Sequence, residues 1–166
     1  MIIEYNRQEV IKYAKKWAYL RNDKYYNFDA LGGDCTNFAS QCICAGSNVM
    51  NFTEIFGWYY KSLNDRSPAW SGVEFLLQFL LNNNGANTFV GNGKGPFAYE
   101  VSLLDALIGD VIFLNNGSKF YHTLIIVGFE DKIPLVASHS YDVYGRQLTS
   151  YSYKNYKVLH IAGIRV

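Results

Sequence analysis

Apolar residues recur at helical spacing near the start of the chain. The stripe consists of Val10, Ala14, Trp17 and Ala18, with Arg21 as its polar end. Asn6 can cap the first turn, and Glu9 three residues later completes a pattern like a capping box. We therefore predict a helix over residues 6–21. The Asn, Asp and Gly residues of 22–34 predict a loop after it.

Two more helices are predicted before the middle of the chain. The first begins near Cys35 and stops at Gly46, a residue type favoured just beyond a helix end. Its apolar stripe consists of Phe38, Ala39, Cys42 and Ala45. The second spans about 72–83 and is apolar on nearly every side, which predicts burial. Residues 82–99 are rich in Asn and Gly and predict a long loop, a kind of segment that is often functional.

From Gly109 onward the pattern changes to short runs of Val, Ile, Leu and Tyr separated by turn residues, which predicts strands. The runs are GDVIFLNN, YHTLIIVGFE, IPLVASHS and KVLHIAGIRV. Helices first and strands after them predict an α+β fold with a mostly antiparallel sheet. The 166 residues contain no repeat or linker, so we expect one domain over 1–166.

Composition and charge exclude several classes of protein. The net charge is +1 and no Lys/Arg run stands out, so no nucleic-acid partner is expected. No apolar stretch reaches the roughly 18 residues of a membrane span. The N-terminus lacks the apolar core of a secretory signal. We expect synthesis in the cytoplasm, with any export following lysis or a non-classical route.

The three cysteines differ in what their positions suggest. An odd number argues against a disulfide framework, and their spacing does not fit a zinc knuckle, so no metal site is expected. Cys42 and Cys44 are best interpreted as small core residues. Cys35 opens a predicted helix, where the helix dipole should lower the pKa of a thiol. Gly32 and Gly33 before it allow a sharp turn and the approach of a substrate. Burial as a small hydrophobic residue is the alternative for Cys35, and the nucleophile is the favoured interpretation.

A nucleophilic thiolate needs a base, and the base needs a partner that orients it. Suppose that the turn after YHTLIIVGFE is centred between Glu130 and Asp131. The numbers of two opposed residues then add up to 261, so His122 faces His139. A shift of one residue would place the two rings on opposite faces of the sheet. His160, in the last predicted strand, is better interpreted as a hydrogen-bonded structural residue.

The run GGDCTNFASQ at 32–41 resembles the hallmark of an amidase-domain family of bacteria and their phages. That family belongs with the papain-like cell-wall hydrolases of the NlpC and CHAP type. The likeness extends along most of the chain. It includes residues 5–28, WYY at 58–60, Trp70-Ser71, IGDVIF at 108–113, YHTLIIV at 121–127 and SHSYD at 138–142.

The resemblance implies a papain-like fold and a role for several residues. Cys35 matches the nucleophile, His122 the general base and His139 the polar third member, for which Asp142 is the reserve candidate. In NlpC-type enzymes a tyrosine ahead of the cysteine often contacts the oxyanion. The resemblance therefore implies this role for Tyr25 or Tyr26. The candidates for oxyanion-hole or substrate contacts are Tyr26, Asp34 and Asp142. Papain has glutamine six residues before its cysteine, whereas this chain has Asp29, an acid poorly suited to donate to an oxyanion.

The resemblance further implies hydrolysis of an amide in peptidoglycan, by an endopeptidase or an N-acetylmuramoyl-L-alanine amidase, with no metal or organic cofactor. The chain would be the catalytic domain of a phage or prophage endolysin, which commonly carries a separate C-terminal wall-binding domain. The 82–99 loop and the aromatic residues Trp58, Tyr59, Tyr60 and Trp70 could line the substrate groove. Core packing is favoured for Trp58 and Trp70. Two alternatives stay open: a thiol acyltransferase or deamidase acting on a protein, and an inactive cell-wall binding module that uses its tyrosines.

Overall fold

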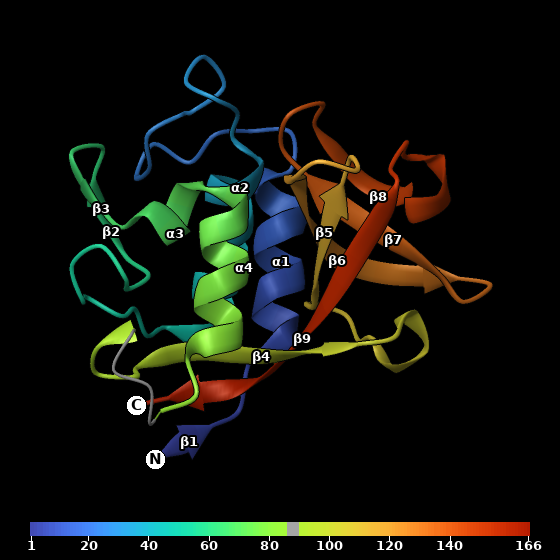
Figure 1. The fold of residues 1–166 in the computed structure, drawn as a ribbon. Coiled ribbons are helices and arrows are strands. Elements are labelled where there is room, and N and C mark those ends of the chain that lie inside the picture. Colours follow the sequence, from blue (N-terminus) through green and yellow to red (C-terminus); the bar gives the residue numbers. More distant parts are fainter. Residues whose placement is uncertain (86–89) are drawn as a thin grey trace.

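A computed structural model describes residues 1–85 and 90–166 of the chain (Figure 1). The helices are α1 (Arg7–Trp17), α2 (Cys35–Ser47), α3 (Pro68–Ser71) and α4 (Val73–Asn82). The strands are β1 (Ile2–Ile3), β2 (Tyr60–Ser62), β3 (Asp65–Arg66), β4 (Gly95–Val101), β5 (Val111–Asn115), β6 (Phe120–Glu130), β7 (Ile133–Ser138), β8 (Val143–Gln147) and β9 (Asn155–Arg165). No helix in the described ranges has the length and apolar character needed to cross a membrane.

The first helix begins as predicted but ends earlier. The side chain of Asn6 accepts a hydrogen bond from the Glu9 N–H at 3.2 Å and caps α1. Val10 and Ala14 are fully buried, as the stripe requires. The helix stops at Trp17, so the predicted end at residue 21 is wrong. Arg21 lies beyond it and forms ion pairs with Asp29, Asp34 and Asp142.

The second helix is the central element of the fold. α2 packs against α1 and β6, and eleven of its thirteen residues are buried. Gly46 lies inside the helix, so the predicted stop there is wrong. A Cβ at Gly46 would lie 2.6 Å from Val10 Cγ2, so glycine allows the two helices to approach closely. The helix ends instead at Asn48, which adopts the left-handed conformation at φ 53°.

The main sheet has seven strands in the order β1-β9-β5-β6-β7-β8, with β4 also paired to β9. All its pairs are antiparallel, so the predicted α+β class with an antiparallel sheet is confirmed. The pattern missed β1 and β8, and the predicted 82–99 loop is wrong from Gly95 onward, where β4 begins. Residues 86–89 of that loop lie outside the described residues.

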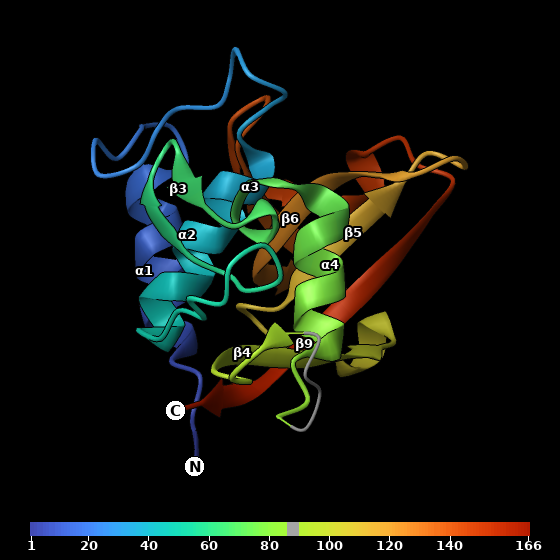
Figure 2. The same cartoon turned by 60° about the vertical axis from the view of Figure 1, so that its left-hand side comes forward.

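Two hydrophobic cores lie on the two faces of this sheet. The larger core joins α1, α2 and α4 to one face, through residues such as Phe38, Phe113 and Ile125. The smaller core covers the other face and contains Ile112, Leu124 and neighbouring residues of β7 and β9. Figures 1 and 2 show the helices gathered on one side of the long strands, with the start of α2 at the end of the molecule where β7 turns into β8.

Candidate active site

A loop with two glycines in the positive-φ region leads into Cys35 at the start of α2. Gly32 and Gly33 have φ of 88° and 103°, a region that side chains with a Cβ rarely adopt. A Cβ on Gly33 would also lie 3.2 Å from Ser140 Oγ, on the loop after β7. The two glycines therefore permit the sharp turn predicted from the sequence. They let this loop pass close to the 138–143 segment.

The Cys35 side chain is fastened to strand β6. It is 7% exposed, and its Sγ lies 3.8 Å from Thr36 Oγ1. Thr36 Oγ1 in turn lies 2.9 Å from Thr123 Oγ1, and the thiol accepts a hydrogen bond from the Thr123 backbone N–H. Thr123 directly follows His122, so the helix that carries the cysteine is held beside the strand that carries the predicted base.

The thiol does not have the lowered pKa that its helix position predicted. Burial raises the pKa of Cys35 above its ordinary value, and the nearby Asp34 carboxylate raises it further. Hydrogen bonds from Thr123 and Thr36 oppose this but do not outweigh it. The predicted lowering of the Cys35 pKa is therefore wrong. Cys35 is a neutral thiol near pH 7.

His122 is held on strand β6 by a serine. The ring is 9% exposed, and its Nε2 lies 3.3 Å from Ser138 Oγ. The Ser138 hydroxyl has one hydrogen, which it can donate to the His139 carbonyl at 2.6 Å. Its oxygen then accepts from a protonated Nε2, which leaves Nδ1 as the basic nitrogen of a neutral ring. Burial and the positive charge of Arg146 lower the pKa of His122 to about 4.

His139 does not face His122. The β6–β7 pairs sum to 263 beside the turn, as in Glu130↔Ile133, and to 262 beyond a bulge, as in Ile125↔Ala137. The predicted sum of 261 is wrong because the turn is centred between Asp131 and Lys132, both of which have positive φ. With a sum of 262, the position opposite His122 is residue 140, and alternation puts His139 on the other face. Ser138, two residues before position 140, shares the face of His122, and its Oγ lies at the ring.

His139 binds Asp34 instead, in a buried polar cluster behind the nucleophile. His139 Nδ1 lies 2.5 Å from Asp34 Oδ2, and its Nε2 lies 2.9 Å from the Trp17 carbonyl. Asp34 Oδ1 accepts from the Phe28 N–H and from Asn37 Nδ2, at 2.8 and 2.9 Å. Burial would raise the pKa of the Asp34 carboxyl, but these hydrogen bonds outweigh it and hold the pKa below its usual value. Asp34 therefore anchors the start of α2.

Arg21 extends this cluster to the surface. Its guanidinium binds Asp142 through two hydrogen bonds of 2.9 and 3.0 Å, and Asp29 at 2.9 Å. Asp142, the reserve candidate for the third member, thus pairs with Arg21 and makes no described contact with His122. Asp29, six residues before the cysteine, is likewise committed to Arg21. Both acids serve to tie loops together.

A pocket of about 400 Å³ opens beside the thiol. Its walls are Gly32, Gly33, Cys35, Tyr121, His122, Ser140, Tyr141, Arg146, Tyr151 and Ser152. The structure thus brings the predicted nucleophile and base into one pocket, although no hydrogen bond joins their side chains in the described part of the chain. Hydrogen bonds of this kind often form only in the substrate complex. Tyr26, Asp34 and Asp142, the other candidates, do not line it.

The tyrosines predicted to serve the oxyanion lie elsewhere. The Tyr25 ring stacks on Trp70 with centroids 5.6 Å apart, and the pKa of its hydroxyl is raised to about 12, mainly by burial. Tyr26 is 41% exposed and packs edge-on against Phe28. Tyr151, which sequence reasoning missed, does line the pocket, and its buried hydroxyl has no hydrogen-bond partner within residues 1–85 and 90–166.

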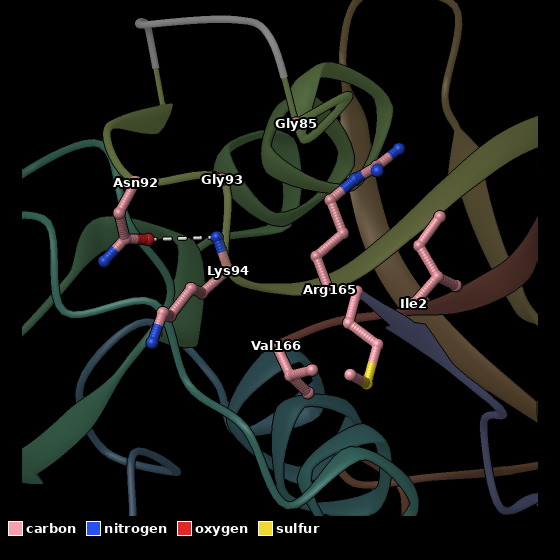
Figure 3. Close-up of a pocket in the computed structure, with 8 residues that line it drawn as sticks. Ile2, Gly85, Asn92, Gly93, Lys94, Arg165 and Val166 are labelled. Carbon is pink, nitrogen blue, oxygen red and sulfur yellow. Dashed lines mark hydrogen bonds between the residues drawn. The ribbon is translucent and has the colours of Figure 1, made fainter.

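Other hollows are larger but lack this chemistry. A pocket of about 480 Å³ lies between the chain ends and the loop around Gly85, with Lys94 and Arg165 as its cations (Figure 3). Another, of about 470 Å³, lies beside Arg7. Neither contains a cysteine or a histidine. Nowhere in the described ranges do three or more His, Cys, Asp or Glu side chains gather closely enough to hold a metal ion.

The remaining residues singled out from the sequence have structural surroundings. Trp58 and Trp70 are fully buried and donate to Ser40 Oγ and Asn37 Oδ1, so the core interpretation is confirmed. Cys42 is buried in the larger core. His160 Nδ1 lies 2.9 Å from Asp110 Oδ2, as expected for a hydrogen-bonded structural residue.

The depressed pKa of His122 predicts how stability depends on pH. An unfolded histidine titrates near 6.5, whereas the folded ring titrates at about 4. Between these values the unfolded chain binds a proton that the folded chain does not, so stability falls as pH drops through this window, by up to about 3 kcal/mol. Urea denaturation at pH 4.5 and 7 should show this loss. His122→Gln should show about 3 kcal/mol less of it; an unchanged loss would refute the assignment.

Comparisons with known proteins assign the chain to a protein family. The family model described as "Putative amidase domain" matches residues 4–162, and the chain belongs to this family. It is 33% identical over 147 residues to "Uncharacterized protein YhbB" of Bacillus subtilis (strain 168). That alignment covers 84% of this chain and 42% of the relative, so the chain spans less than half of the relative's length. No solved structure matches the chain.

Proposed function

We propose that the protein is a cysteine-dependent amide hydrolase with a papain-like arrangement, acting on bacterial cell-wall peptidoglycan. One observation carries the proposal: Cys35, at the start of a buried helix, and His122, on the adjoining strand, line the same pocket. Membership of an amidase family supports amide hydrolysis as the reaction. The protein would be made in the cytoplasm and reach the wall after lysis or non-classical export.

The proposed reaction starts from two neutral groups. With its pKa at about 4, His122 is an unprotonated base near pH 7, and Cys35 is a thiol. His122 takes the thiol proton as Sγ attacks the amide carbonyl, and the imidazolium then protonates the departing amine. Water, deprotonated by His122, hydrolyses the thioester. The Cys35 N–H, which has no acceptor within its own helix, is placed to bind the oxyanion.

We assign the orienting role to Ser138 rather than to His139. Ser138 Oγ lies at the His122 ring, whereas His139 is committed to Asp34. A hydroxyl that accepts from Nε2 fixes the tautomer in which Nδ1 is basic, as a third member does in other triads. His139 then helps to position the nucleophile, because it binds Asp34, the residue that precedes Cys35.

Two variants separate these roles. Ser138→Ala should lower kcat about tenfold with little change in KM, because the His122 ring loses its orientation. It should lower the free energy of unfolding by about 1 kcal/mol, because the His139 carbonyl and the His122 ring each lose a hydrogen bond. His139→Gln should instead lower the free energy of unfolding by more than about 2 kcal/mol, because the Asp34 carboxylate loses its partner. Steady-state kinetics and urea denaturation of both variants test this. A selective kcat loss in His139→Gln would restore the triad predicted from the sequence.

The function itself is tested by digesting purified cell walls. Walls of several Gram-positive chemotypes are incubated with wild type and with Cys35→Ala, and newly freed amino and carboxyl ends are identified. New ends from the wild type alone would support the proposal. The residues that bear them would distinguish an endopeptidase from an N-acetylmuramoyl-L-alanine amidase. Release of no ends from any wall would contradict a wall hydrolase and would direct the search to protein substrates.

The larger protein context is also a proposal. The matched relative is more than twice as long as the aligned segment, since the alignment covers 42% of it. We propose that this unit works as the catalytic domain of an endolysin-like protein, in which a separate C-terminal domain binds the wall. Fusion to a known wall-binding domain should then increase wall digestion without changing the bond that is cut.

A further inference from the structure

Arg146 is the charged group in the wall of the candidate active site. It lies on β8 and lines the same pocket as Cys35 and His122. The other walls are glycine, serine, tyrosine, the Cys35 thiol and the His122 imidazole. With a pKa of about 4, His122 is uncharged near pH 7. Arg146 is therefore the one formal charge among the residues that line this pocket.

The guanidinium of Arg146 is held in a fixed plane. Its Nε donates to Ser150 Oγ at 2.7 Å, and its Nη2 donates to the Ser150 carbonyl at 3.1 Å. Its central carbon lies 3.8 Å from the centroid of the Tyr151 ring, in the range of a cation–π contact. The guanidinium also acts on the Tyr151 hydroxyl, where it opposes the burial that raises the pKa of that group. No carboxylate or backbone carbonyl of residues 1–85 or 90–166 accepts a hydrogen bond from Nη1. The side chain is thus rigid and retains unused donors beside the pocket.

Other arginines of the chain show the contrast. Arg7 forms an ion pair with Asp110 at 2.7 Å, and Arg21 forms one with Asp142 at 2.9 Å. No carboxylate of residues 1–85 or 90–166 forms an ion pair with Arg146. A planar guanidinium with free N–H groups matches the two oxygens of a carboxylate, and partial burial strengthens such a pair.

We propose that Arg146 binds a free carboxylate of the substrate, next to the amide that Cys35 attacks. The proposal deepens the proposed function and rests on it for the identity of the reaction. It makes Arg146 a specificity-determining residue: substrates with a free carboxyl group at this position are preferred over their amides.

Alkylation of Cys35 tests the electrostatic part without any substrate. Iodoacetate and iodoacetamide differ by a carboxylate, and peptide mapping by mass spectrometry follows Cys35 separately from Cys42 and Cys44. The ratio of the iodoacetate rate to the iodoacetamide rate should fall about tenfold in Arg146→Gln. Arg146→Lys should retain most of the ratio, because the charge remains. Added salt should lower the ratio in the wild type more than in Arg146→Gln.

Lys132→Asn provides a matched control for net charge. Lys132 is exposed in the β6–β7 turn, which lies at the other end of the strand from His122, and asparagine tolerates its positive φ. In Lys132→Asn, the ratio of the iodoacetate rate to the iodoacetamide rate should equal that of the wild type. An equal ratio in wild type and in folded Arg146→Gln, judged by thermal unfolding, would overturn the proposal. If Arg146→Gln does not fold, the salt dependence of the wild-type ratio decides instead, and its absence would overturn the proposal.

Substrate pairs test the specificity. Two wall peptides that differ only in a free or amidated carboxyl group beside the scissile bond are compared. Arg146→Gln should lower kcat/KM about 30-fold for the free acid and less than about threefold for the amide. Equal losses for both would overturn the carboxylate assignment. If the wild type cleaves neither peptide nor any wall, the proposed hydrolase fails, whereas the alkylation ratio still decides whether Arg146 attracts a carboxylate.

Discussion

Cys35→Ala and His122→Ala should each lower kcat at least about 10⁴-fold, and the double variant should be no slower than the slower single variant. The two groups act as a unit, because a neutral thiol with a raised pKa is not an effective nucleophile until a base accepts its proton. The rate of amine release from a wall fragment that the wild type cleaves measures this effect.

A second cysteine serves as the control. Cys44 is only partly buried and lies on the later part of α2, about two and a half helical turns after Cys35. Cys44→Ser should therefore retain activity within about twofold. All variants should unfold at similar urea concentrations. Retention of a tenth or more of the activity in His122→Ala would contradict its role as the base.

The second large effect is expected on stability, from Asp34→Ala. Its carboxylate is fully buried and bonded to His139, Asn37 and the Phe28 N–H. Removing one member of such a cluster leaves the others without partners and should lower the free energy of unfolding by about 3–5 kcal/mol. The lowered pKa makes the contribution full above about pH 4, the ordinary carboxyl value, and it is lost as pH falls through the folded pKa. Urea denaturation at pH 7 measures it.

Asp29→Ala is the control for this variant. Asp29, like Asp34, forms an ion pair with Arg21, but its side chain is 44% exposed, so its loss should cost less than about 1 kcal/mol. Equal losses in both variants would show that Asp34 has no special role. The Asp34 carboxylate also raises the pKa of Cys35. In Asp34→Asn, Cys35 should therefore be alkylated faster than in the wild type at pH 7, even though the variant is less stable.

Local patterns predicted the elements that depend on local physics. The Asn6 cap, the buried stripe of α1 and the helix that starts at Cys35 follow from side-chain spacing and capping, which the sequence displays directly. The end of α1 did not follow, because Arg21, the polar end of the predicted stripe, lies beyond the helix and binds the distant Asp142. The interior position of Gly46 depends on how closely α1 approaches, which no local pattern reveals.

The sequence was enough to predict the nucleophile and the base of the candidate site, but not the residues that contact them. Cys35 and His122 were found from residue type and order. Ser138 was missed because the pairing of β6 with β7 depends on a turn at Asp131 and Lys132 and on a bulge beyond Ile126. An alternating strand does not reveal a bulge, and one residue of shift exchanges Ser138 for His139. Arg146 was missed because the strand that carries it, β8, has no clear alternation.

The pairing of the first strand with the last has a consequence for the order of folding. Among the described strands, β1 pairs only with the end of β9, and β9 also joins β4 to β5. During synthesis, the segment that carries Cys35 leaves the ribosome long before residues 155–165, which complete the sheet beneath it. Contacts so distant in sequence form slowly. A ribosome-bound chain truncated before β9 should therefore lack the ordered pocket, so that the thiol and its base come together only late in synthesis.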